Sequence, residues 1–182
     1  MDDQNLPDSI GSEVVKPPAL TPKEEELCQK LDELHSNYNL KVKPSDMFRG
    51  AIFTMRSELR SNPDWMAQSA NSLREILYPF SHDGIPNKEE ALRQFGSVRV
   101  DTELGDELGR VFGTLTELAH HGNGKSSSVD YLTYTSVQFE ELVARFENIM
   151  FDVMSRQIDV HNEIDQLLKS APSVLDANEN QL

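Results

Sequence analysis

Residues 101–121, DTELGDELGRVFGTLTELAHH, decide the fold. Gly105, Gly109 and Gly113 recur at every fourth position within a stretch that otherwise has the apolar periodicity of one amphipathic helix. A glycine inside a helix costs about 1 kcal/mol relative to alanine, so three of them need compensation. Residues four apart share one helix face, so the three glycines form a groove without side chains. We predict that another helix comes very close to this glycine groove.

The groove lies beside an apolar ridge, and similar stripes recur along the chain. The pattern predicts an all-α fold, a bundle of about five helices with one long C-terminal helix. Residues 21–170 form the single bundle domain, 1–20 a disordered arm and 171–182 a flexible tail, because neither end has apolar periodicity. We predict a core of Leu31, Phe48, Ile52, Met55, Trp65, Leu73, Leu77, Leu108, Phe112, Leu115, Phe146, Met150 and Val153.

Capping signals give the expected helix boundaries. Two T-x-x-E/Q capping boxes open the first helix at Thr21 and the last at Thr135, which continues to about residue 169. The second helix is expected over 45–60, and Asn62, followed by Pro63, is the expected cap of the third. The polar connection 81–100 contains a short helical piece, 88–95, and the weak strand candidate 96–100. Residues 122–124, Gly-Asn-Gly, are expected to end the glycine-containing helix.

The last helix carries a heptad seam in which a single polar residue interrupts apolar positions. The seam consists of Val143, Phe146, Met150, Val153, Gln157, Val160, Ile164 and Leu167. A long core helix of one bundle and a dimer-forming helix both fit this pattern. The helix is longer than the others, so we expect a homodimer through its end, through the glycine groove, or through both. Gln157, Val160 and Ile164 would form the interface, with Gln157 close to its symmetry mate.

The composition excludes several classes of function. The formal charge of −14 and the pI of about 4.7 argue against DNA binding, which usually needs a basic face. The single cysteine, Cys28, fits a reducing compartment, and as a helical residue among acids it is a poor nucleophile. We expect a cytoplasmic protein with no membrane span, no metal and no cofactor.

Five basic side chains are candidates for chemistry: Arg74, His120, His121, Arg156 and His161. A planar guanidinium suits phosphate or carboxylate, and an imidazole can move a proton near neutral pH. Plainer roles are open for each of them, such as a surface arginine or imidazolium groups that interact with a helix dipole. His120 continues the face of Gly109, Gly113 and Thr116, so it lies at the end of the glycine groove.

The string from Arg156 to His161 resembles the R-x₄₋₆-H motif of the HEPN family. That resemblance implies an all-helical bacterial or archaeal protein, often a dimeric metal-independent RNase of toxin–antitoxin or defence systems. In such a site arginine neutralises the phosphate and histidine transfers the proton. Gln157 stands where the family often has a small polar residue.

A second resemblance covers about residues 63–170. The segments AQSANSLREILYPF, LTELAHHGNGKS and the terminal helix resemble those of uncharacterised bacterial helical proteins. It implies a common fold, and a HEPN relationship would make Arg74 with His120 or His121 the catalytic pair.

Two functions from different classes follow. The first is a non-catalytic protein–protein interaction module, an accessory or regulatory subunit of a bacterial system. The alternative is a HEPN-like RNase, for which an arginine and a histidine must meet in a cleft. Only this alternative would involve RNA.

Overall fold

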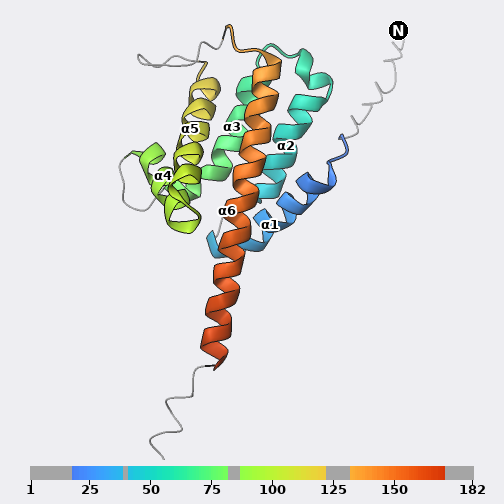
Figure 1. Cartoon of the computed structure of the whole chain (residues 1–182). Coiled ribbons are helices and arrows are strands. Elements are labelled where there is room, and N and C mark those ends of the chain that lie inside the picture. The colour runs from blue at the N-terminus through green and yellow to red at the C-terminus, as the bar shows by residue number, and fades with distance from the viewer. Residues whose placement is uncertain (1–17, 39–40, 82–86, 122–131, 171–182) are drawn as a thin grey trace, which may run out of the picture.

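The computed structural model describes residues 18–38, 41–81, 87–121 and 132–170, and all the regular secondary structure in these ranges is helical. The helices are α1 (Pro22–Tyr38), α2 (Pro44–Arg56), α3 (Trp65–Leu77), α4 (Lys88–Arg99), α5 (Thr102–Ala119) and α6 (Ser136–Ser170), with 3₁₀ turns η1 (Glu58–Ser61) and η2 (Tyr78–Ser81) (Figure 1). The predicted fold class is confirmed. The predicted arm and tail lie outside the described residues, apart from residues 18–20.

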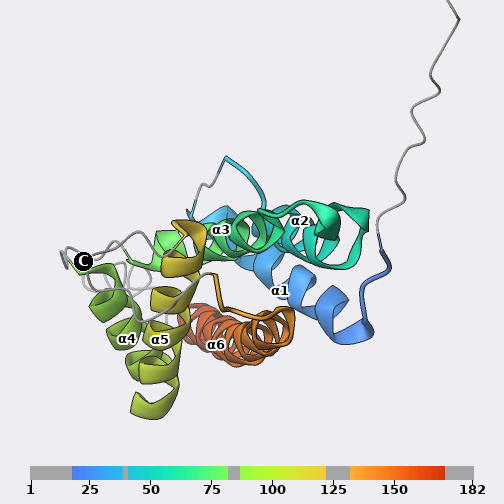
Figure 2. The same cartoon turned by 90° about the horizontal axis from the view of Figure 1, so that it is seen from above.

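Seen from above, α2 and α3 form one row and α5 and α6 a second, with α1 against α2 and α6 (Figure 2). α4 packs on α5 at the edge of the bundle. All thirteen predicted core residues are buried. Phe48 stacks on Phe146 across α2 and α6, and Trp65 meets Phe139 edge to face. These aromatic pairs join the helices of the first half of the chain to α6.

Both predicted capping boxes are present. The backbone N–H of Thr21 donates to Glu24 Oε2 (2.6 Å), and that of Glu24 to Thr21 Oγ1 (3.3 Å). At the start of α6 the N–H of Thr135 donates to Gln138 Oε1 (2.8 Å), and that of Gln138 to Thr135 Oγ1 (3.2 Å). These reciprocal bonds satisfy amides that a helix start leaves unpaired, so the two boundaries could be predicted from local sequence.

Other predicted boundaries were wrong. The second helix ends at Arg56, because Ser57 is extended and its Oγ accepts from the N–H of Leu59 to start η1, which leaves Leu59 exposed. Asn62 does not cap α3: its side chain accepts from the N–H of Asp64, and the helix begins only at Trp65.

The strand candidate 96–100 was also wrong, since α4 continues to Arg99. At the end of α5, His121 has the positive φ of 57° expected of a glycine C-cap. The predicted stop at 122–124 lies outside the described residues.

The glycine groove holds α4. A Cβ on Gly96 of α4 would lie 2.8 Å from the Cα of Gly105, so the two helices meet glycine to glycine. Further along, the Arg93 side chain lies over Gly109 and pairs with Asp106 (2.9 Å) and Glu89 (2.8 Å). Because α4 fills the groove, a second copy cannot dock there, and that part of the dimer prediction was wrong.

Candidate functional site

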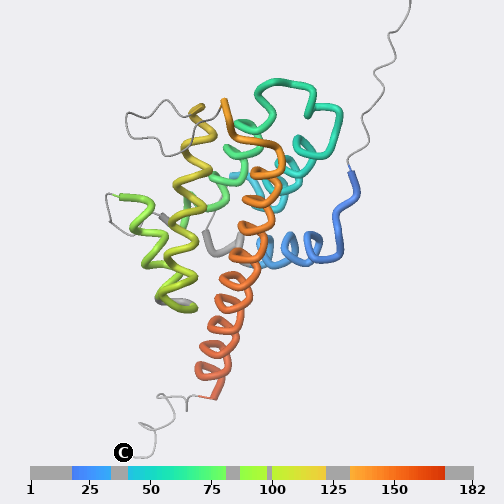
Figure 3. Tube along the Cα trace, turned by 45° about the horizontal axis from the view of Figure 1, so that its top comes forward, coloured from blue at the N-terminus to red at the C-terminus, as the bar shows by residue number. Residues whose placement is uncertain are grey.

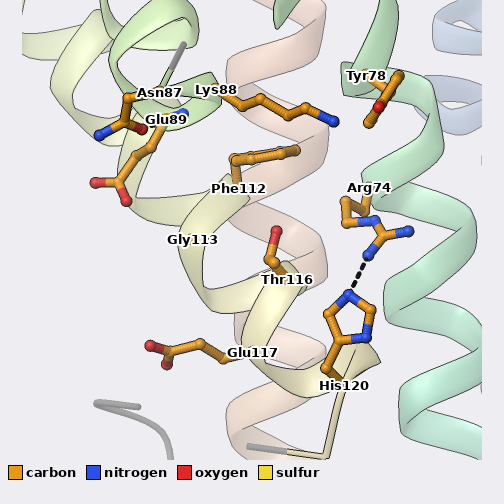
Figure 4. A pocket seen from close by; sticks show the side chains of 10 residues that line it. All are labelled: Arg74, Tyr78, Asn87, Lys88, Glu89, Phe112, Gly113, Thr116, Glu117 and His120. Carbon is orange, nitrogen blue, oxygen red and sulfur yellow. Dashed lines mark hydrogen bonds between the residues drawn. The ribbon is translucent and has the colours of Figure 1, made fainter. Parts of the chain in front are cut away.

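An open cleft of about 570 Å³ lies where α3, η2, α4 and α5 converge. Figure 4 shows its side chains, with the ribbon of α5 crossing between α4 and α3. Gly113 lies in its wall, at the end of the glycine groove, where a Cβ would lie 3.2 Å from the Glu89 carboxylate of α4. The lining residues are Arg74, Tyr78, Asn87, Lys88, Glu89, Phe112, Gly113, Thr116, Glu117 and His120.

Arg74 and His120 meet in this cleft. Arg74 projects from α3 and is largely buried, with 16% of its side chain exposed. Its Nη1 lies 2.8 Å from Nε2 of His120, and its Nη2 donates to Glu75 Oε1 at 2.7 Å. The Glu75 contact fixes the plane of the guanidinium, so one edge faces the histidine. An arginine and a histidine from distant parts of the chain are therefore in direct contact.

The contact with Arg74 restricts which ring nitrogen of His120 acts as the acceptor. A guanidinium can only donate hydrogen bonds, so Nε2 of His120 must be the acceptor. This acceptor role requires the tautomer that carries its proton on Nδ1. His120 stands at the C-cap of α5, where its own N–H bonds Thr116 O and Leu118 O. The residue is exposed, so an arriving ligand can reach the ring.

Two buried polar atoms near this pair have no hydrogen-bond partner in the described structure: Arg74 Nε and Thr116 Oγ1. In Figure 4 the Thr116 hydroxyl points into the space between Phe112 and Arg74. A buried donor without a partner costs about 1–3 kcal/mol, so such atoms in a cleft indicate where a polar ligand would bind.

The charges around the cleft are mixed. Lys88 reaches across from α4, with Nζ 3.4 Å from the centre of the Tyr78 ring. The carboxylates of Glu89 and Glu117 lie on the other side of α5 from Arg74 (Figure 4). The cleft can thus attract one anionic group near Arg74 and Lys88, but the neighbouring carboxylates repel a polyanion.

The other three basic candidates lie elsewhere. His121 turns away from the cleft, and its Nε2 lies 2.7 Å from Asp64 Oδ1. Arg156 and His161 are on α6, and Arg156 Nη1 lies 3.5 Å from Glu163 Oε1. Five residues apart on a helix, Arg156 and His161 point about 140° away from each other, so they do not form a pair within one chain.

The sequence indicated only part of the cleft. The resemblance in the SLRE and HH segments suggested Arg74 with His120 or His121, and helical spacing placed Thr116 near His120. Tyr78 and Lys88 were missed, because their positions depend on the η2 turn and on the packing of α4 against α5.

A second surface is formed by the end of α6, which continues well beyond the other helices (Figures 1 and 3). The seam is buried from Val143 to Val153 but emerges further on. Gln157 and Val160 are half-buried, whereas Ile164 is 47% and Leu167 69% exposed. Leu168 adds a further side chain at 70%. We call Val160, Ile164, Leu167 and Leu168 the α6 stripe.

A polar cluster outside the cleft joins α1, α2 and α6. Glu24 is almost fully buried and binds the guanidinium of Arg56 through both oxygens. Burial alone would raise the pKa of Glu24, but the bonds from Arg56 and Thr21 lower it overall. Glu147 of α6 is the third member. Burial, together with the charge of Glu24 and a hydrogen bond to it, raises the pKa of Glu147 to about 7.

Glu147→Gln is expected to stabilise the protein at pH 8 by about 1–2 kcal/mol and to change little at pH 4.5. With a pKa of about 7 in the folded protein and an ordinary value of 4.5, Glu147 stabilises the fold below pH 4.5, and this contribution is lost as the pH rises through 7. The expected stabilisation is smaller than the pKa shift alone would give, because Glu147 is only partly buried and solvent screens its charge. Urea denaturation at both pH values measures it. An equal effect at both would contradict the raised pKa.

The thiol of Cys28 is buried, which raises its pKa to about 11, so it is a poor nucleophile as predicted. The main cause is burial rather than the neighbouring acids.

No protein-family model, curated protein or solved structure matches this chain. None of the helices in the described ranges is long and apolar enough to cross a membrane. Within those ranges, no three His, Cys, Asp or Glu side chains are grouped to hold a metal ion. The function is therefore inferred from the arrangement of the chain's own side chains.

Proposed function

We propose that this protein is a non-catalytic helical interaction module that works as a homodimer, as an accessory or regulatory subunit of a bacterial system. The observation that carries the proposal is the α6 stripe: apolar side chains on one face of a helix that extends past its own bundle. Exposed apolar patches of this kind mark interaction sites, because water contact with them is unfavourable. The strongly acidic composition fits a protein partner better than a nucleic acid.

Replacing Val160 and Ile164 with Asp is expected to convert the dimer into a folded monomer. Two carboxylates in the centre of an apolar contact would need desolvation without a partner, which raises the dissociation constant at least 100-fold. Static light scattering at tens of micromolar measures the mass, and circular dichroism reports the helix content.

The matched control is Asn162→Asp with Gln166→Asp, which adds the same two charges on the opposite face of α6. This control should remain a dimer. A wild-type protein that is monomeric at these concentrations would contradict the proposed dimer.

The second candidate function is a HEPN-like metal-independent RNase, favoured by the 2.8 Å contact between Arg74 and His120 in the cleft. Arg74 would bind the scissile phosphate, with the Thr116 hydroxyl beside it. Once the phosphate draws Nη1 away, Nε2 of His120 is free to accept the proton of the 2′-hydroxyl as its oxygen attacks the phosphorus. The bond from phosphorus to the 5′-oxygen then breaks, and the departing oxygen takes a proton from water. This function ranks second because Glu75, Glu89 and Glu117 surround the cleft and oppose binding of an extended RNA.

For the RNase, His120→Asn is expected to reduce cleavage at least 100-fold, the usual contribution of a general base. Cleavage of fluorescent single-stranded RNA in EDTA measures this rate. His121→Asn is the control, since His121 contacts Asp64 outside the cleft and should leave the rate unchanged. Loss of activity in His161→Asn but not in His120→Asn would assign the chemistry to α6 instead. No cleavage of any RNA by the wild type would exclude this candidate.

A further inference from the structure

The α6 stripe continues the face of α6 that its own bundle covers. At 100° per residue, Ile164, Leu167 and Leu168 lie within an arc of about 100°, and the buried Met150 and Val153 fall within the same arc. Helices α1, α4 and α5 pack on the N-terminal part of α6. Beyond Val153 the same face emerges gradually: Gln157 and Val160 are half-buried, and the side chains from Ile164 onward are exposed. A helix that covers the α6 stripe must therefore lie directly beneath the base of the bundle.

This position restricts the direction of a covering helix that belongs to a second copy. In a parallel pair, both bundles would be at the same end, and each would need the space beside α6 that the other bundle occupies. In an antiparallel pair, the second α6 enters from the free end, and the two bundles lie at opposite ends of the paired segment. Bundle packing on the seam face thus permits an antiparallel pair and obstructs a parallel one.

We infer that the two copies pair antiparallel through residues 157–170 of α6, about 21 Å of helix, with the bundles at opposite ends. The inference rests on the homodimer of the proposed function and specifies its geometry. The heptad spacing supports a second copy as the occupant, because a seam repeating every seven residues fits a helix with the same repeat. The exposed leucines at the free end add support, since the base of the partner's bundle covers them in this arrangement.

The register follows from the seam. In an antiparallel pair, the a positions of one heptad seam face the d positions of the other. Val160 therefore faces Ile164 of the partner subunit, and the two-fold axis repeats the contact. Gln157 faces Leu167 of the partner subunit, at the ends of the paired segment rather than at its centre. Arg156 and Glu163 flank the α6 stripe and lie 3.5 Å apart within each chain, so together they carry no net charge. The two-fold axis therefore brings together two such ion pairs rather than two carboxylates without a counter-charge.

Single cysteines test this direction. In a Cys28→Ala background, one chain carries Val160→Cys and another, extended by a short tag, carries Ile164→Cys. A disulfide needs Cα atoms within about 7 Å, so oxidation should link only neighbours across the interface. The expected result is a cross-linked product from the mixture of the two chains and little from either chain alone. Asn162→Cys mixed with Gln166→Cys, on the opposite face, is the control and should not cross-link.

Two other results have distinct meanings. If each variant cross-links efficiently with itself while the wild type is dimeric by light scattering, the pair is parallel. That result overturns this inference but leaves the homodimer in place. If nothing cross-links and the wild type is monomeric at tens of micromolar, both the homodimer and its antiparallel geometry are overturned.

Discussion

Gly105→Ala is expected to destabilise the fold by about 2–3 kcal/mol, although alanine is the better helix former by about 1 kcal/mol. A Cβ at this position would lie 2.7 Å from the backbone nitrogen of Ser97 and closer still to the carbonyl oxygen of Arg93. Backbone atoms in the middle of α4 cannot move aside as a side chain can. The helix must therefore shift as a whole, which opens the contact along the entire glycine groove. Urea denaturation measured by circular dichroism gives the free energy of unfolding.

Gly50→Ala is the matched control for this prediction. Gly50 also lies inside a helix, α2, but a Cβ there would have no neighbour within 4 Å. Alanine should therefore stabilise by about 0.5–1 kcal/mol, through helix propensity and the lower entropy of the unfolded chain. Gly109→Leu tests an intermediate case, because its Cβ meets the flexible side chain of Arg93 at 2.5 Å. If Gly105→Ala and Gly50→Ala had the same effect, the close approach of α4 would be contradicted.

The glycine groove shows what the sequence can and cannot reveal. Three glycines on one helix face imply a close neighbour, because nothing else offsets their cost. The identity of that neighbour was not evident, since the second half of α4 contains Gly96 and Val98, which are weak helix formers. The close approach of Gly96 to Gly105 packs this segment against α5, and such a contact between separate segments has no local signal.

The last helix illustrates a different limit. Its start was encoded locally by Thr135 and Gln138, and the structure confirms it. The heptad seam is equally regular before and after Gln157, so the sequence could not show where the bundle stops covering it. That point depends on the lengths and angles of α1 and α5, which determine how far they extend along α6.

The cleft could be predicted from the sequence only in part. Helical spacing placed His120 and Thr116 together, since both lie on α5. Their meeting with Arg74 requires α3 to pack beside α5, which no spacing in the sequence specifies. The same applies to Glu24, Arg56 and Glu147, which come from three helices and were not recognised as a group.

Arg56→Leu is expected to cost about 2–3 kcal/mol at pH 8. Glu24 is 2% exposed, and Arg56 is its main counter-charge, so the substitution leaves a buried carboxylate beside Glu147 without compensation. The penalty should be smaller at pH 5, because the two carboxyl groups can then bind a proton and relieve their repulsion. Chemical denaturation of the wild type and the variant at both pH values measures the difference.

A neighbouring ion pair supplies the control. Arg49 and Glu25 also link α2 to α1, with both nitrogens of the guanidinium on the carboxylate at 2.7 and 3.1 Å, but both side chains are nearly half exposed. Arg49→Leu should therefore cost less than 1 kcal/mol, as is usual for a surface pair. Adding Glu24→Gln to Arg56→Leu should recover part of the lost stability, because the amide oxygen can still accept from Thr21 without a charge. Equal losses for Arg49→Leu and Arg56→Leu would show that burial of Glu24 does not determine the strength of its ion pair.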